Sequence, residues 1–341
     1  MCWLIHFHGM KNSRFYLISL LFVVAFGFVT APEPEQASFV VPSHFPAPLY
    51  DFSNNRLTQE GVELGRHLFY DPILSRDSTI SCASCHLSFT AFTHVDHAQS
   101  HGIEDRIGRR NSLTLMNLAW SRHFMWDGAA NHLDVQALTP ISDSTEMDER
   151  LEHVVQKLNR SPGFRSGFFQ AFGDSTATGE RILKALSQFE LTLVSANSKY
   201  DRMKLGKDSF SLQEQNGYRL FQKNCSRCHT EPLFTHGGFE KNNLPLDTIL
   251  NDFGRMRITL NAADSLKFKV PTLRNIEFSY PYMHDGRFKK LRDVLNFYTS
   301  AATTELNIVL SANEKVDLTA FLLTLTDREF LFNPDYSFPK K

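Results

Sequence analysis

"SCASCHLSFTAF" occupies residues 81–92, and a shorter version of its central pattern, "NCSRCHT", returns at residues 224–230. The chain has 341 residues and only five cysteines, and four of the five lie in these two C-x-x-C-H pentapeptides. Two disulfides or one four-cysteine zinc site would use the same thiols. Neither alternative needs a histidine directly after each cysteine pair, whereas c-type haem attachment does, because two thioethers hold the porphyrin and the adjacent imidazole binds iron.

The pattern therefore predicts two covalently bound haem c groups. Their expected attachment residues are Cys82, Cys85, His86, Cys225, Cys228 and His229. The surroundings repeat as well: "ELGRHLF" (63–69) and "QNGYRLF" (215–221) precede the two sites, and "FTH" follows each of them, at 92–94 and 234–236. Such a repeat predicts two equivalent modules.

The other periodic stretches are helical. Capping boxes of the form S-x-x-E predict helices that begin after Ser211 and Ser311. The stretch 180–196 carries its apolar residues along one face and predicts a core helix, whereas residues 230–275 are rich in Gly, Asn, Asp and Pro and predict loops. The expected fold is mostly α, with two cytochrome c-like haem domains and long irregular loops.

The N-terminus predicts export. Lys11 and Arg14 precede an uncharged run at residues 15–29, which is shorter than the roughly 20 residues that span a bilayer comfortably. Both a cleaved signal peptide and an uncleaved tether stay open. The expected division of the chain is a signal peptide (1–31), a Pro-rich linker (32–48), an N-terminal haem domain (49–205), a C-terminal haem domain (206–330) and a tail (331–341).

The overall composition is that of a globular protein, with 42% hydrophobic and 21% charged residues and a formal net charge of −1. There is no basic stripe along the chain. Nucleic acid is therefore excluded as an expected partner.

Six stretches together resemble the bacterial di-haem cytochrome c peroxidases and their MauG-type relatives. They are "LGRHLFYDPILSRDSTISCASCH", "GRRNSLTLMN", "FMWDGAANHLDVQALTPISDSTEM", "CSRCH", "FKVPTLRNIEFSYPYMHDGRF" and "LRDVLNFY", spread over about residues 55–328. The resemblance implies a periplasmic enzyme whose N-terminal haem reacts with hydrogen peroxide and whose C-terminal haem relays electrons from a small cytochrome c or a copper protein (a cupredoxin). A homodimer is a further expectation.

The same resemblance implies roles for three residues near the first haem. Glu146 looks like the family's distal glutamate, Gln136 like its distal glutamine, and Trp126 like the tryptophan between the two haems. A distal acid suits the chemistry, because bound peroxide must lose a proton from one oxygen and gain one on the other. From composition alone, Glu146 would be a surface residue of an acidic segment and Trp126 a core residue.

A calcium ion between the domains is also implied. Asn111 looks like its side-chain ligand, and Ser279 and Pro281 stand where the family offers backbone carbonyls. Oxygen ligands of this kind suit Ca²⁺.

The sequence departs from the well-known peroxidases at the second haem. His284 of the "MHDG" motif belongs to the expected cofactor-binding set, and the residue fourteen positions later, a methionine in those enzymes, is Tyr298. A tyrosine here is similar to MauG. Phenolate stabilises ferric iron and lowers the potential, whereas thioether raises it. Met283 is a rival ligand, and a half-buried helix tyrosine without a metal role remains the simpler alternative.

A second departure concerns the loop that carries a capping histidine in many members of the family. The S-x-G-H pattern reads Ser100-His101-Gly102-Ile103, and isoleucine cannot bind iron. An open iron site that needs no reductive activation is expected.

Three functions are compatible with these residues. The first is a cytochrome c peroxidase, and the second is a MauG-like oxidase that uses a high-valent two-haem state to oxidise a protein or another organic substrate. The third is a di-haem electron carrier without peroxide chemistry. Glu146 argues against the carrier, because a relay needs no distal acid, whereas Tyr298 favours the oxidase.

Overall fold

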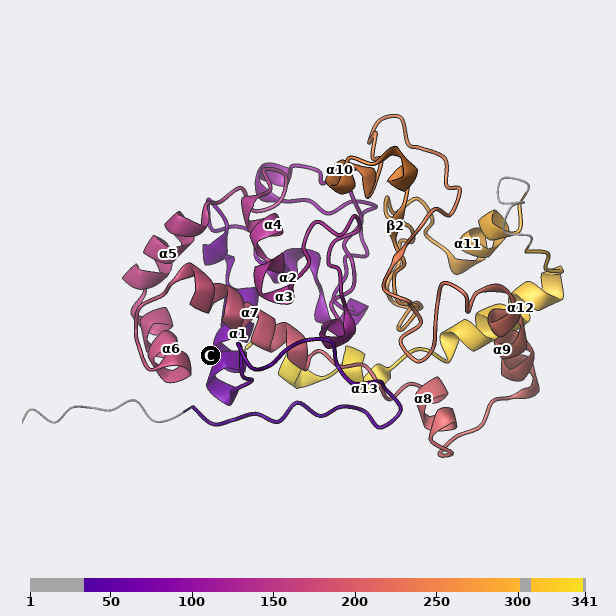
Figure 1. Ribbon diagram of the computed structural model, residues 1–341, viewed down its shortest axis with the longest axis horizontal. Helices are drawn as coiled ribbons and strands as arrows, with labels where there is room; N and C mark the ends of the chain where they lie inside the picture. The colour runs from indigo at the N-terminus through magenta and orange to yellow at the C-terminus, as the bar shows by residue number, and fades with distance from the viewer. Residues whose placement is uncertain (1–33, 301–307, 340–341) are drawn as a thin grey trace, which may run out of the picture. The chain divides into compact units, whose positions relative to one another are not determined.

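The structure is a computed structural model, and it describes residues 34–300 and 308–339 (Figure 1). Its regular structure is mostly helical. The longer helices are α1 (Gln59–Tyr70), α5 (Leu151–Arg160), α6 (Pro162–Phe172), α7 (Gly179–Thr192), α9 (Leu212–Asn224), α11 (Leu291–Tyr298) and α12 (Ala312–Leu323). The shorter ones are α2 (Cys82–Cys85), α3 (Leu133–Gln136), α4 (Leu138–Ser142), α8 (Lys199–Lys204), α10 (Met256–Thr259) and α13 (Arg328–Leu331).

Among the described residues, sheet is confined to one small two-stranded ribbon. Strand β1 (Phe239–Glu240) pairs antiparallel with β2 (Phe268–Lys269), with Phe239 opposite Lys269 and Glu240 opposite Phe268. Within the described ranges, no helix combines the length and the apolar character needed to cross a bilayer. The expected signal peptide lies outside the described residues.

Both predicted capping boxes are confirmed. Ser211 caps α9 and Ser311 caps α12, and in each case the hydroxyl accepts from the backbone of a glutamate whose carboxylate accepts from the backbone of the serine. The core helix predicted over 180–196 is α7. Residues 230–275 contain, besides irregular chain, only the ribbon, α10 and one short 3₁₀ turn, as their composition predicts.

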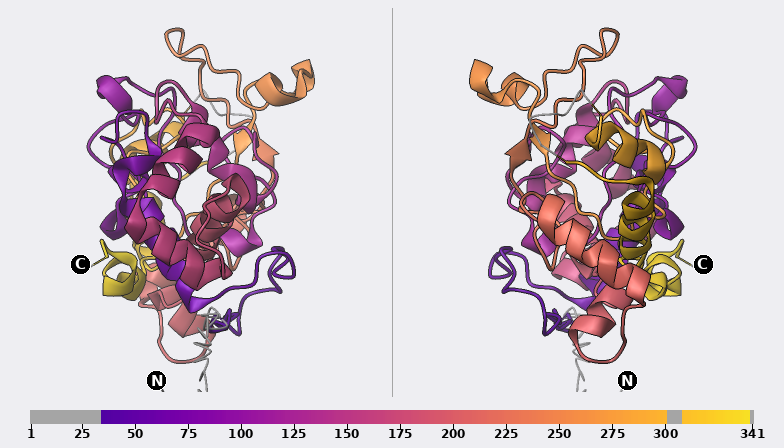
Figure 2. Two further views of the ribbon diagram at one scale, coloured as in Figure 1. Left: turned by 90° about the vertical axis from the view of Figure 1, so that its left-hand side faces the viewer. Right: turned by 90° about the vertical axis from the view of Figure 1, so that its right-hand side faces the viewer.

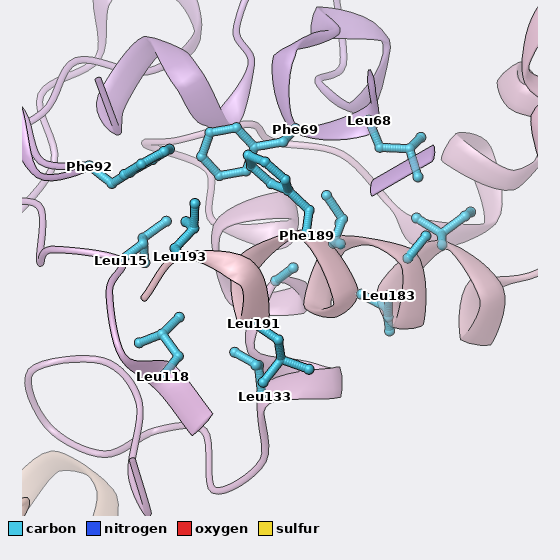
Figure 3. Close-up of a cluster of buried hydrophobic side chains, with 14 of the residues drawn as sticks. Leu68, Phe69, Phe92, Leu115, Leu118, Leu133, Leu183, Phe189, Leu191 and Leu193 are labelled. Atoms are coloured by element: carbon cyan, nitrogen blue, oxygen red, sulfur yellow. The ribbon is translucent and has the colours of Figure 1, made fainter. Parts of the chain in front are cut away.

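The first hydrophobic cluster is built where α1 crosses α7. Gly65 makes the close approach possible, because a Cβ at this position would lie 1.9 Å from the Ala185 carbonyl oxygen. In the same cluster, the rings of Phe69 and Phe189 lie 5.2 Å apart and those of Phe69 and Phe92 lie 5.8 Å apart (Figure 3). Aromatic pairs at these separations are attractive beyond the area they bury.

The second cluster repeats this construction where α9 crosses α12. A Cβ on Gly217 would lie 1.9 Å from the Asp317 carbonyl oxygen. The ring of Phe221 lies 5.1 Å from Phe321 and 5.4 Å from Phe234. The left view of Figure 2 looks onto the α5, α6 and α7 side of the molecule and the right view onto the α9 and α12 side. The sequence repeat around the two C-x-x-C-H motifs is thus a repeat of helix crossings.

Gly65→Ala is expected to lower the free energy of unfolding by about 1–3 kcal/mol, because the methyl group forces α1 away from the α7 backbone. Gly163→Ala in α6 is the matched control, since its Cβ would meet no atom within 4 Å. The control should be neutral or stabilising by up to about 1 kcal/mol. Denaturant unfolding of both variants measures the difference, and equal stabilities would contradict a tight crossing.

The two clusters are joined by a second repeat, which lies outside the repeat around the C-x-x-C-H motifs. Asn117 and Asn275 both have left-handed backbone (φ 56° and 57°), and each holds the segment that follows a core helix. Asn117 Oδ1 accepts from the Ser195 amide after α7 (2.9 Å), and Asn275 Oδ1 accepts from the Asp327 amide after α12 (2.7 Å). The two ends meet, because the Ser195 hydroxyl donates to the Asp327 carboxylate (3.1 Å).

The described part of the expected linker, residues 34–48, packs against the rest of the chain. Phe45 is 8% exposed, and its ring lies 5.1 Å from Trp120. His44 Nε2 lies 2.8 Å from Asp201, which also forms a bidentate ion pair with the fully buried Arg274. Proline content indicated a linker, but the phenylalanine and histidine side chains between the prolines supply apolar surface and a hydrogen bond that fix this segment.

Candidate active site

Two short segments hold the C-x-x-C-H motifs, and we call Cys82, Cys85 and His86 the first haem site and Cys225, Cys228 and His229 the second. The four thiols form no disulfide. Within the described ranges, the metal-binding side chains that converge are Cys228, His236 and Glu240, so the two cysteine pairs do not come together as a zinc site would require. The two cysteines of the first haem site are the first and last residues of α2, which comes after α1 in the chain. The second haem site begins directly after α9.

The two histidines are oriented alike. His86 Nδ1 lies 2.7 Å from the Phe92 carbonyl oxygen, and His229 Nδ1 lies 3.1 Å from the Phe234 carbonyl oxygen. A carbonyl only accepts, so Nδ1 carries the hydrogen and Nε2 keeps its lone pair. Burial lowers the pKa of both imidazoles to about 4, which keeps them neutral at pH 7.

This donor set fits haem c. A neutral imidazole that is held through Nδ1 presents Nε2 to a metal, and a backbone acceptor is a usual outer partner of such a ligand. Both phenylalanines supply that acceptor from left-handed backbone, at φ 57° in Phe92 and 54° in Phe234. The unpaired thiols next to each imidazole complete the attachment pattern.

Glu146 lies in the segment after α4, at the first haem site. Burial raises its pKa to about 7, and the charge of Asp143 adds to the rise. Burial raises the pKa of the Cys85 thiol to about 11, and the charge of Glu146 adds to the rise. Glu146 therefore lies close to the attachment residues. The loop with Ile103 packs on it, since the Ile103 amide donates to the Glu146 carbonyl (2.7 Å) and a Cβ on Gly102 would lie 2.5 Å from the Glu146 Cα.

The position of the family's capping histidine is filled by Ile103, which is fully buried. The nearby His101 points its Nδ1 at the carboxylate of Asp105 (2.6 Å), a side chain that is 84% exposed. Its ring also stacks on His97 with centroids 4.3 Å apart. His101 is therefore engaged at the surface of the loop.

Gln136 and Trp126 occupy defined places. Gln136 ends α3, and its amide donates to the sulfur of Met125 (3.5 Å). No hydrogen bond joins Gln136 to Glu146 among the described residues. Trp126 is 8% exposed and donates through its indole to the Asn111 carbonyl (2.8 Å). Its ring meets that of His284 edge-on, 6.5 Å away.

Tyr298 lies near the cysteines of the second haem site, and Met283 shares the neighbour Asn242 with it. Burial raises the pKa of Tyr298, and the neighbouring Cys225 and Cys228 raise it further, whereas the Asn242 amide lowers it. The same amide lies 3.4 Å from the Tyr298 hydroxyl and 3.8 Å from the Met283 sulfur. Both candidate ligands are thus grouped around one side chain, and the choice between them stays a prediction.

The predicted calcium ligands are not joined by contacts among the described residues. The Asn111 side-chain amide donates to the Ala98 carbonyl (3.1 Å), and its backbone amide donates to the His284 carbonyl (2.8 Å). Ser279 and Pro281 belong to the segment that leads to Met283. The calcium site stays a prediction.

Two features of the site were missed in the sequence. Glu190 lies on the apolar face of α7 at 5% exposure, with its pKa raised to about 8 by burial and then by Asp134. The signal for Glu190 in the sequence is its position seven residues after Leu183, which places a charged residue on the apolar stripe of the predicted helix. The second is an internal repeat with a spacing of 158 residues, in which Asn117 corresponds to Asn275. The same spacing, without gaps, aligns "SRHFMWDG" (121–128) with "SYPYMHDG" (279–286).

The chain is similar to known di-haem cytochrome c peroxidases. The family model for di-haem cytochrome c peroxidase matches residues 59–209. The cytochrome c551 peroxidase of Nitrosomonas europaea is 36% identical over 283 residues, which cover 82% of each chain. The methylamine utilization protein MauG of Methylorubrum extorquens is 34% identical over 309 residues, covering 85% of this chain and 84% of MauG.

A solved structure agrees. A MauG-like protein associated with microbial copper homeostasis superposes with a TM-score of 0.80 at 29% identity, covering 89% of this chain and 99% of that protein. Identity above 30% over more than four fifths of a peroxidase and of a MauG protein accounts for both the two attachment motifs and the helical framework. The chain belongs to the di-haem cytochrome c peroxidase family, which includes MauG, and is an oxidoreductase with haem c as its cofactor.

Proposed function

We propose that this protein is a periplasmic di-haem peroxidase that reduces hydrogen peroxide to two waters, taking two electrons one at a time from a small cytochrome c or a cupredoxin. The observation that carries the proposal is Glu146, a partly buried carboxyl with a pKa near 7 beside the first haem site. An electron carrier has no use for such a group. The peroxidase relatives support the same reaction class.

The reaction H₂O₂ + 2 e⁻ + 2 H⁺ → 2 H₂O needs proton transfer as well as electrons. Haem held by Cys82, Cys85 and His86 would supply the redox chemistry for peroxide at the first haem site. Ionised Glu146 takes the proton from the inner oxygen and returns it to the outer one, and a pKa near the working pH suits both steps. Gln136 is the proposed second polar group beside the peroxide.

Electrons have to pass from the second haem site to the first. Trp126 is proposed as the aromatic group between them, with the ring of His284 against it at 6.5 Å. His284 is in turn stacked on Phe268 with centroids 3.6 Å apart. Asn111, Ser279 and Pro281 are the proposed ligands of a calcium ion that holds the segments on which these rings lie.

A MauG-like oxidase is the second candidate, favoured by Tyr298. A phenolate ligand would keep the second haem oxidised at potentials where a cytochrome donor reduces a methionine-ligated haem. Organic or protein residues would then replace the donor as the source of electrons. Ile103 in place of a capping histidine is compatible with either candidate and supports a first haem that reacts without prior reduction.

Peroxide-dependent oxidation of a reduced small c-type cytochrome tests the proposal. Two donors should be oxidised for each peroxide, directly from the ferric resting enzyme. Failure to oxidise such a donor or a reduced cupredoxin, by a protein with both haems attached, would reject the peroxidase and favour the oxidase.

The pH profile of this turnover gives a sharper prediction. The carboxylate form of Glu146 is the proton acceptor, so kcat/KM for peroxide should rise with pH and level off above about 7. Asp143→Asn removes a charge that raises this pKa, and the midpoint of the profile should move to lower pH. A midpoint that stays in place in the Asn variant would argue that another group controls the rate.

A further inference from the structure

Four charged side chains close a ring next to the segment that carries Glu146. Arg76 donates to the carboxylates of Asp148 (2.5 Å) and Glu104 (2.6 Å). Arg106 donates to the same two carboxylates, to Asp148 at 2.9 Å and to the other oxygen of Glu104. Each arginine therefore bridges both acids, and each acid bridges both arginines. We call these four residues the ionic ring.

The ionic ring joins three separate stretches of the chain. They are the turn with Arg76, the Ile103 loop (residues 100–108, with Glu104 and Arg106) and the Glu146 segment (residues 143–148, with Asp148). Arg106 also donates to the Ser144 carbonyl (2.8 Å), and the Arg76 amide donates to the Met147 carbonyl (3.0 Å). The two arginines thus hold the chain on both sides of Glu146.

The Ile103 loop has a backbone that depends on contacts from outside the loop. Glu104 and Asp105 are both left-handed (φ 55° and 58°). Non-glycine residues rarely adopt this conformation and keep it only where the surrounding structure holds them. The Glu146 segment supplies such contacts, because a Cβ on Gly102 would lie 2.2 Å from the Thr145 carbonyl oxygen. The loop and the segment therefore hold each other.

Glu146 depends on this arrangement for its position. Among the described residues, its carboxylate has no hydrogen-bond or ion-pair partner, while its backbone carbonyl accepts from the Ile103 amide (2.7 Å). An acid that exchanges a proton with a bound substrate has to lie within hydrogen-bond reach of it. The place of the Glu146 side chain is therefore set through its backbone, which the ionic ring and the Ile103 loop hold.

We propose that the ionic ring positions Glu146 for proton transfer, with Arg76 and Arg106 as positioning residues. A single exposed ion pair contributes little, because solvent and salt screen it, whereas several charges that form one network contribute more. In this ring every member has two partners, so the loss of one arginine releases both acids from a shared contact. The inference rests on the proposed function, in which Glu146 is the distal acid.

Hydrogen exchange of the ferric holoprotein, followed by mass spectrometry, tests whether the ring holds the segment. Arg106→Met is the variant and Arg181→Met the matched control, since Arg181 also donates to a carboxylate (Asp174, 2.9 Å) and to a carbonyl (Thr176, 2.8 Å). Amides of residues 143–148 should exchange about 5–30-fold faster in Arg106→Met and at the wild-type rate in the control.

Two further exchange experiments do not depend on the Arg106 variant. Asp148→Asn removes the negative charge that the two arginines share and should accelerate exchange in the same residues. The wild type should lose protection there at about 1 M sodium chloride, where the screening length falls to about 3 Å. Arg106→Met should respond much less to salt, because its ring is already open.

Peroxide turnover tests whether the ring positions the acid. In Arg106→Met, kcat/KM for peroxide should fall by about 10–100-fold, because a small displacement of a reacting group is costly. The midpoint of the pH profile should also move to lower pH. Burial raises the pKa of Glu146, with Asp143 adding to the rise, and a released segment loses that burial. Arg106→Lys keeps a cation between the acids and should recover part of the activity.

Two results would overturn the proposal. Equal exchange rates of residues 143–148 in Arg106→Met and Arg181→Met would show that the ring does not hold the segment. Faster exchange with an unchanged kcat/KM and pH midpoint would show that the ring supports the loop without positioning the acid. Full activity of Glu146→Gln would instead reject the distal acid of the proposed function. The exchange rates would still differ between the two arginine variants in that case, so the two failures are distinguishable.

Discussion

Glu146→Gln is expected to lower kcat/KM for peroxide by about 10²–10⁴-fold, while both haems remain attached. Glutamine keeps the size and the hydrogen-bonding capacity of the side chain but cannot accept and return a proton. The partly buried carboxyl of Glu146, with its pKa near 7, is the acid–base group that we assign to the peroxide oxygens. Steady-state oxidation of a reduced cytochrome donor measures the loss, and the pyridine haemochrome spectrum measures haem content.

The control is Glu152→Gln, six residues further along the chain. Glu152 is 73% exposed and has only a distant ion pair with Arg150 (3.7 Å). It should retain wild-type turnover. Full activity of Glu146→Gln would show that the distal acid is a different residue, and the dependence of turnover on pH would then need another source. Loss of a haem in the variant would be visible separately in the haemochrome spectrum.

Tyr298→Met is expected to raise the midpoint potential of the second haem by on the order of 0.1–0.4 V, because a thioether ligand favours ferrous iron and a phenolate favours ferric iron. Tyr298 ends α11 beside Cys225 and Cys228, close enough for these residues to raise its pKa after burial has done so. Potentiometric titration followed in the visible bands resolves the two haems. The same variant should be reduced by a small cytochrome c more readily than the wild type.

Met283 provides the internal comparison for this experiment. Its sulfur lies 3.8 Å from the Asn242 amide that also reaches the Tyr298 hydroxyl, so the two candidates share one environment. Met283→Leu should leave the second potential unchanged if Tyr298 is the ligand. A shift in Met283→Leu together with an unchanged midpoint in Tyr298→Phe would assign the iron to Met283 instead.

Local sequence patterns determined much of the framework. The C-x-x-C-H motifs predict both attachment sites, because haem attachment depends on residues that are adjacent in the chain. The capping boxes at Ser211 and Ser311 identified two helix starts for the same reason, since a capping box closes within four residues. The family resemblance then pointed to Glu146, which composition alone assigned to the surface.

Tertiary structure decided the features that depend on contacts between distant segments. The crossing at Gly65 needs α7, more than a hundred residues later, and the packing of residues 34–48 needs Trp120 and Asp201. A charge such as that of Glu190 looks like an ordinary polar residue in the sequence. Only the folded chain shows that Glu190 is enclosed near Cys82 of the first haem site, because burial is a property of neighbours in space and not of neighbours in sequence.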